Sequence, residues 1–193
     1  MKLNNKYYIL RHGEAVSNVR SVVSSSPEKF ENPLTDKGKR QIIQVAQKLK
    51  GKGIDLIFSS DLLRAKQTAE IIAKALKIAQ KFDKRLREIG FGNFNGKPLV
   101  NFQRQFKNER ERITKSVLKS ETYEKVSKRM SGFLEDIDIK YKDKNILIVS
   151  HESPLWILRA KINKIPLLQS LKKAKKEGKR IHNGQVKELN ELN

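Results

Sequence analysis

Residues 7–18 read Tyr-Tyr-Ile-Leu-Arg-His-Gly-Glu-Ala-Val-Ser-Asn, and this stretch decides how the rest of the chain is interpreted. Its apolar, β-favouring residues 7–10 lead into Arg11 and His12, and a glycine then turns the chain. A run of this kind is typical of a buried strand, and open α/β sheets bind their ligands at the carboxyl ends of strands. The stretch therefore predicts a site that combines a fixed cation with a nucleophile or base. The alternative is that His12 merely ends a strand against a backbone carbonyl.

Strand and helix patterns alternate after this stretch. Thr35 can cap a helix that carries apolar residues on one face, and residues 54–58 form a second apolar run. A second amphipathic helix follows residues 59–61. This order predicts a mainly parallel sheet with flanking helices. The remaining predicted elements are a helix at 123–137, a strand at 145–149, a helix that Ser153 caps and Pro154 opens, and a last strand at 185–189.

Three more polar side chains lie at junctions of these elements. Arg64 falls in the first turn of the helix after the second strand, where backbone N–H groups and the helix dipole favour an anion. His151 follows the strand at 145–149, and Glu88 lies in the glycine-punctuated loop at 85–96. Two arginines and two histidines without a matching acid cluster predict a pocket for a dianion, because the arginine fork binds two phosphate oxygens.

This set of residues predicts phosphoryl-transfer chemistry. Neighbouring guanidinium groups would keep His12 neutral and nucleophilic near pH 7. His12 could then attack phosphorus, and the arginines with His151 would stabilise the charge on the transferred group. Glu88 could protonate the leaving oxygen and later activate water. We expect the reaction to need no metal and no cofactor.

Five ordered motifs resemble those of the histidine phosphatase superfamily, the phosphoglycerate mutase-like phosphatases with an Arg-His-Gly motif. The resemblance covers roughly residues 6–162 and implies a three-layer α/β/α sandwich. Its motifs are Leu-Arg-His-Gly-Glu at 10–14 with Asn18, Leu-Thr-Asp-Lys-Gly at 34–38, Ser-Ser-Asp-Leu-Leu-Arg-Ala at 59–65 with Thr68, Leu-Arg-Glu at 86–88 with Phe91, Gly92 and Gly96, and Val-Ser-His at 149–151, besides a weaker one from Ser120 to Arg129.

The resemblance also implies a role for each matched residue. His12 would be the phosphohistidine nucleophile and Glu88 the proton donor. The phosphoryl group would be bound by Arg11, Arg64 and His151, with contacts from Asn18 and from Ser24 or Ser25. One departure is Glu152, which stands where the family usually has glycine. A carboxylate there would repel the substrate unless it turned away or paired with a cation. We expect it to face outward at the helix start, where the dipole favours an acid.

Length and composition fit one domain that spans residues 1–193. We expect residues 91–140 to supply a helical cap over the site, although residues 123–137 could simply pack on the sheet, which we favour. The chain has no cysteine and no apolar run long enough to cross a bilayer. We therefore expect a cytoplasmic protein that does not associate with membranes.

The formal net charge of +21 favours anionic partners. It includes the basic run at 172–180 but is spread along the whole chain, and it could also be a lysine-rich surface without a specific use. The expected function is hydrolysis of a small phosphorylated substrate through a phosphohistidine. The alternatives are a phosphoglycerate mutase, for which the segment between Glu88 and His151 is short, a phosphoprotein phosphatase, and a nucleic-acid-binding protein that retains the fold.

Overall fold

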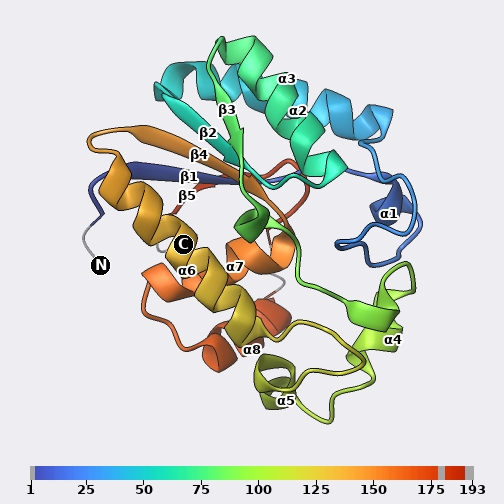
Figure 1. The fold of residues 1–193 in the computed structure, drawn as a ribbon. Helices are drawn as coiled ribbons and strands as arrows, with labels where there is room; N and C mark the ends of the chain where they lie inside the picture. Colours follow the sequence, from blue (N-terminus) through green and yellow to red (C-terminus); the bar gives the residue numbers. More distant parts are fainter. Residues whose placement is uncertain (1–2, 178–180, 190–193) are drawn as a thin grey trace.

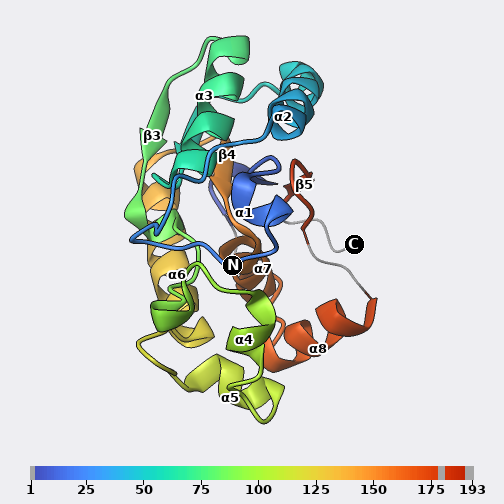
Figure 2. The same ribbon diagram turned by 90° about the vertical axis from the view of Figure 1, so that its right-hand side faces the viewer.

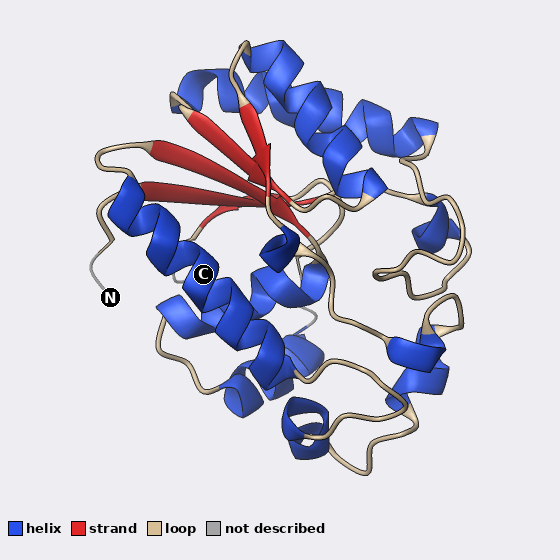
Figure 3. Ribbon diagram, in the orientation of Figure 1, coloured by secondary structure: helices blue, strands red, loops and turns tan. Residues whose placement is uncertain are grey.

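The computed structural model describes residues 3–177 and 181–189, and it contains a central five-stranded sheet with helices on both faces (Figures 1 and 3). This arrangement confirms the predicted α/β fold with a mainly parallel sheet. The strand order is β3-β2-β4-β1-β5, and only the β1–β5 pair is antiparallel. The strands are β1 (Lys6–Arg11), β2 (Leu56–Ser59), β3 (Gln80–Phe82), β4 (Asn145–Ser150) and β5 (Val186–Glu188).

Two helices cover the face of the sheet at the top of Figure 1, namely α2 (Asp36–Leu49) and α3 (Leu63–Leu76). The predicted cap of α2 is confirmed, because the Thr35 hydroxyl accepts a hydrogen bond of 3.0 Å from the Gly38 N–H. Ile42 and Ile72 are fully buried on the inner faces of the two helices. Their apolar stripes pack against Leu10 and Val149 of the sheet in one buried cluster.

The opposite face carries α6 (Tyr123–Lys140) and α7 (Glu152–Ile162), with α8 (Leu167–Glu177) beyond them. The α6 stripe packs on the sheet as expected, and the rings of Phe133 and Phe58 meet edge to face at 5.6 Å. The side chains of residues 173–180, which hold most of the basic run, lie outside the described residues.

The predicted start of α7 was wrong by two residues. The helix begins at Glu152, and its N-cap is His151 rather than Ser153. His151 keeps the extended backbone of β4, with φ −121° and ψ 173°, so the strand passes directly into the helix. Pro154 is then the third helical residue, which the fold tolerates because N–H groups of the first turn have no intrahelical partner.

A smaller lobe of short helices lies beside the carboxyl ends of the strands and away from α2 and α3 (Figure 2). Its elements are α4 (Leu99–Gln103) and α5 (Glu109–Thr114), and α1 (Val16–Val19) lies nearby. Phe102 is buried and meets the rings of Phe91, Phe94 and Phe106 edge to face, which anchors α4. Single-turn 3₁₀ helices complete the fold, η1 (Lys50–Lys52), η2 (Lys84–Leu86) and η3 (Gly92–Phe94).

No helix in the described part of the chain is both long and apolar enough to cross a membrane.

Candidate active site

The sheet register brings the two predicted histidines together. Arg11 of β1 pairs with Ser150 of β4, so His12 and His151 follow at neighbouring strand ends. The His12 N–H donates a 3.1 Å hydrogen bond to the Ser150 carbonyl. The two imidazole centroids are 5.1 Å apart with the rings at 61°, and both side chains are buried. Two strands that are distant in sequence therefore hold both imidazoles in fixed positions.

The hydrogen bonds of His12 fix its tautomer. Nδ1 lies 2.8 Å from the Gly13 carbonyl oxygen, which can only accept, so Nδ1 carries the proton. Nε2 is then an unprotonated acceptor, and the Arg64 Nε–H donates to it at 3.1 Å. The turn needs its glycine, because a Cβ on Gly13 would lie 2.7 Å from the Gly38 carbonyl oxygen of α2. The basic nitrogen of His12 is thereby the one that faces the arginine.

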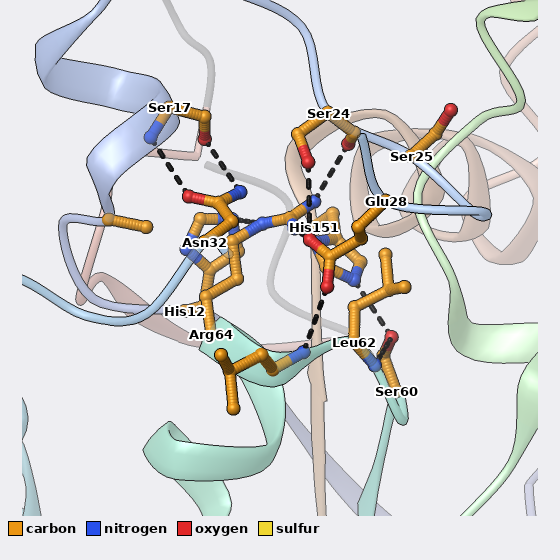
Figure 4. A network of polar contacts seen from close by, with 12 residues as sticks. His12, Ser17, Ser24, Ser25, Glu28, Asn32, Ser60, Leu62, Arg64 and His151 are labelled. Carbon is orange, nitrogen blue, oxygen red and sulfur yellow. Dashed lines mark hydrogen bonds and ion pairs between the residues drawn. The ribbon is translucent and has the colours of Figure 1, made fainter. Parts of the chain in front are cut away.

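Arg64 lies in the first turn of α3, as predicted, and only 2% of its surface is exposed. Its guanidinium links three groups (Figure 4). Nε donates to His12, Nη2 donates to the Ser24 carbonyl at 2.9 Å, and Nη1 pairs with the Glu28 carboxylate at 2.8 Å. Each of the three guanidinium nitrogens of Arg64 thus donates to His12 or to a residue of the loop between α1 and α2.

Within the described residues, two buried nitrogen atoms near this centre have no hydrogen-bond partner. They are Arg11 Nε and His151 Nδ1. The other ring nitrogen of His151 lies 2.9 Å from the Ser60 hydroxyl, which holds the ring in place. Buried polar atoms are rarely left unpaired in proteins. An incoming anion is the kind of ligand that would satisfy both.

Burial shifts the pKa of each histidine and of Glu88 in the site, and the direction for His12 is the expected one. Desolvation, reinforced by Arg64 and Arg11, holds the pKa of His12 well below 6.5. The same causes lower the pKa of His151. Burial raises the pKa of Glu88 above 4.5, although its hydrogen bond from the Ile89 N–H opposes the shift. A neutral histidine next to a carboxyl group that resists ionisation suits a nucleophile and a proton donor.

The expectation for Glu152 was wrong. Its side chain does not face outward but lines the cavity, where its carboxylate forms a 2.6 Å ion pair with Arg11 Nη1. The same nitrogen donates to the Ile181 carbonyl at 2.9 Å. The reason is proximity, because α7 starts immediately after β4, and β4 is the direct neighbour of the strand that carries Arg11.

Glu28 was missed by the sequence reading. Its carboxylate accepts from Arg64 Nη1, from the Ser24 hydroxyl at 3.1 Å and from the Leu63 N–H at 3.5 Å (Figure 4). It therefore lies at the amino terminus of α3, where an anion is favoured. Both site arginines consequently have a carboxylate partner, Glu152 for one and Glu28 for the other.

The three predicted minor contact residues lie in different settings. Ser24 lines the cavity, and its carbonyl binds Arg64. Asn18 also lines the cavity, but its side-chain oxygen accepts the Ala15 N–H at 2.9 Å and so caps α1. Ser25 is not among the cavity-lining residues, and its hydroxyl accepts the Phe91 N–H at 3.1 Å. Ser25 therefore ties the loop to the small lobe.

A segment near the end of the described chain contacts the backbone of Arg11 and His12. The Gly184 N–H approaches the Arg11 and His12 carbonyls at 3.1 and 3.2 Å, and the Asn183 amide donates to the His12 carbonyl at 3.1 Å. No local sequence pattern predicts these contacts beyond the expected last strand at 185–189, which the structure confirms as β5.

A cavity of about 330 Å³ lies between the strand ends and the small lobe, and it is lined by Arg11, His12, Arg64, Glu88 and Glu152 among others. His151 is fully buried and is not among the lining residues. A larger cavity of about 560 Å³ lies between α6, α7 and the start of α8, and it contains none of the predicted site residues. Among the described residues, no cluster of three or more histidine, aspartate or glutamate side chains could hold a metal ion.

Comparisons with known proteins agree with this architecture. The sequence model of the histidine phosphatase superfamily (branch 1) matches residues 7–177. The chain is 32% identical over 164 residues to a protein of Escherichia coli O1:K1 / APEC named probable phosphoglycerate mutase GpmB, and the match covers 82% of this chain and 75% of that protein.

Solved structures are similar over most of the chain. Bacillus stearothermophilus YhfR matches with a TM-score of 0.76 and 26% identity, covering 86% of this chain and 83% of that one. The mycobacterial glucosyl-3-phosphoglycerate phosphatase matches with a TM-score of 0.79, covering 94% and 87%. Its 22% identity shows likeness of fold alone.

Proposed function

Because the chain belongs to the histidine phosphatase superfamily, we propose that it is a phosphatase that hydrolyses phosphomonoesters through a phosphohistidine on His12. One observation carries the proposal. His12 presents an unprotonated Nε2 to Arg64 while its Nδ1 proton is held by a backbone carbonyl. A neutral imidazole with its basic nitrogen directed at an arginine is prepared to attack a phosphoryl group that the arginine binds.

In the first step, a phosphoryl oxygen would take over the Arg64 Nε–H, which frees the lone pair of His12 Nε2. Nε2 then forms a bond to phosphorus while the ester P–O bond breaks on the opposite side. Glu88 gives its proton to the leaving oxygen, and the alcohol departs. Arg64, Arg11 and His151 stabilise the transferred group, whose oxygens would engage the unpaired Arg11 Nε and His151 Nδ1. The raised pKa of Glu88 supports its protonated state before this step.

In the second step, the Glu88 carboxylate takes a proton from a water molecule. The water oxygen attacks phosphorus, the N–P bond breaks, and the electron pair returns to His12 Nε2. Inorganic phosphate leaves, and both residues regain their initial protonation states. The two steps together consume one water and release one alcohol and one phosphate.

A mutase is the second candidate, and the observation in its favour is the 32% identical relative named probable phosphoglycerate mutase. In a mutase the phosphoryl group on His12 would pass to a hydroxyl of the substrate instead of to water. The cavity side chains described above would serve either acceptor. Isomerisation of phosphoglycerate that depends on a 2,3-bisphosphoglycerate primer would identify this activity.

The test is hydrolysis of p-nitrophenyl phosphate in the presence of a chelator, combined with acid quenching to trap a phosphorylated protein. We expect His12→Ala to lower kcat at least about a thousandfold and to abolish the trapped intermediate. His182→Ala is the matched control, because His182 is exposed and is not among the cavity-lining residues. Retained activity in the His12 variant would contradict the proposal.

A further inference from the structure

The cavity in front of His12 extends from the strand ends to the small lobe. Its far wall includes Arg112 of α5 and Tyr123 at the start of α6. Both ribbon views place α5 at the side of the molecule remote from α2 and α3 (Figures 1 and 2). The cavity is therefore larger than a phosphoryl group needs, and its far end is formed by elements other than those that hold the nucleophile.

Among the described residues, Arg112 contacts an aromatic ring and no acid. Its Nη2 donates to the Tyr123 hydroxyl at 3.0 Å, and its guanidinium carbon lies 5.6 Å from the centre of the same ring. Its Nε is buried and has no hydrogen-bond partner in the part of the chain that the structure describes. A guanidinium on an aromatic face keeps its charge and its fork of donors available to a ligand.

The charge balance of the cavity differs between its two ends. Arg11 and Arg64 have the carboxylate partners Glu152 and Glu28. Arg112 also lines the cavity, but within residues 3–172 and 181–189 no carboxylate lies in ion-pair distance of it. A cation that is partly removed from water without a counter-charge favours an anion in its place.

The uncharged part of the cavity wall contains the apolar residues Val22, Val23, Phe91, Leu99 and Phe102 beside serine and asparagine side chains. It would suit the uncharged middle of a ligand, whose two ends would meet arginines. We infer that Arg112 is a specificity-determining residue for a phosphomonoester with a second anionic group, a carboxylate or a further phosphate, at the end remote from the transferred phosphoryl. This inference rests on the proposed phosphatase activity.

The test compares matched probes that differ only in their far end. Phosphorylated ω-hydroxy acids with two to five methylene groups are compared with n-alkyl phosphates and with alkanediol bisphosphates of the same lengths. We expect kcat/KM at one chain length to be about tenfold or more higher for an anionic probe than for the neutral one, mainly through KM. A preference for the acid or for the bisphosphate identifies the second group.

Arg112→Gln should lower kcat/KM for the anionic probes much more than for the n-alkyl phosphates and so remove this preference. Arg112→Lys should retain part of it, because it keeps the charge but not the fork. Arg110→Gln is the matched control, since Arg110 is an exposed residue of the same helix and should keep the full preference. Equal rates for anionic and neutral probes of every length would overturn the inference, as would an equal slowing of both classes by Arg112→Gln.

Calorimetry with non-hydrolysable phosphonate analogues separates this inference from the proposed function. An Arg112-dependent preference for the anionic phosphonate without any turnover would remove the phosphatase proposal and support the second subsite. Turnover without any such preference would support the phosphatase proposal and remove the second subsite. Thermal unfolding of each variant verifies that the substitutions leave the small lobe folded.

Discussion

Glu28→Gln tests whether a carboxylate of the protein competes with phosphate for Arg64. The substitution keeps the size of the side chain and removes its charge. In the structure this carboxylate accepts from Arg64 Nη1 at 2.8 Å, from the Ser24 hydroxyl at 3.1 Å and from the Leu63 N–H at 3.5 Å. These are donors that a phosphoryl group at the start of α3 would use. A bound phosphate must therefore displace Glu28 or share the arginine with it.

The expected gain follows from the strength of the contact that is weakened. A hydrogen bond to a charged group contributes about 1.5–3 kcal/mol, and a neutral one contributes about half as much. Replacing the carboxylate by an amide thus relieves roughly 0.8–1.5 kcal/mol of competition, which corresponds to about fourfold to twelvefold in affinity. We expect the dissociation constant of inorganic phosphate to fall by about that factor in the variant.

The assay is calorimetric titration with inorganic phosphate, supported by its inhibition constant against p-nitrophenyl phosphate hydrolysis. Glu31→Gln is the control, because Glu31 is an exposed acid in the same loop and its loss changes the net charge equally. Unchanged or weaker phosphate binding in Glu28→Gln would refute the reasoning. It would show that the carboxylate serves to orient Arg64 and not to occupy it.

Three further predictions concern ionisation, Glu152 and stability. The pKa of His12 is held well below 6.5, so nitrogen NMR should show the His12 ring as the neutral Nδ1–H tautomer while the pH falls through 6.5. A titration midpoint of His12 at or above 6.5 would contradict this assignment. Glu152→Gly removes the carboxylate partner of Arg11, so phosphate should bind roughly threefold to tenfold more tightly in calorimetry, and weaker binding would argue that the ion pair positions the arginine. Asp138→Ala removes a buried carboxylate that accepts from the Asn4 N–H, the Asn5 amide and the Tyr7 hydroxyl. We expect it to lower the free energy of unfolding, measured in urea, by roughly 3 kcal/mol. The control Asp136→Ala, at an exposed acid, should lower it by less than about 1 kcal/mol.

The sequence was sufficient for those parts of the fold and site that depend on local pattern. The apolar runs at β1, β2 and β4 and the helical stripes of α2, α3 and α6 are periodic, and their order implies a parallel sheet. Strand ends of a parallel sheet lie on one edge, so the placement of His12, Arg64 and His151 near one another could be predicted as well.

Contacts that depend on long-range geometry could not be predicted. Glu28 lies in an irregular loop whose sequence has no periodicity, so nothing local brings it to Arg64. The edge strand β3 is short and mostly polar, and it therefore lacks the apolar run by which β1, β2 and β4 were found. The pairing of Glu152 was mispredicted because it depends on the β1–β4 register, which no single segment encodes.

The parallel pairing of β1 with β4 also constrains how the molecule can fold. The two neighbours of β1 in the sheet, β4 and β5, both come late in the chain, and the register joins Lys6 to Asn145. The apolar residues of β1 therefore stay unpaired with β4 until a loop of more than a hundred residues has closed. Closing so long a loop is slow. Until that closure an unpaired apolar strand is open to association with other chains. The contact that brings the two imidazoles together is thus also the step that ends the most vulnerable stage of folding.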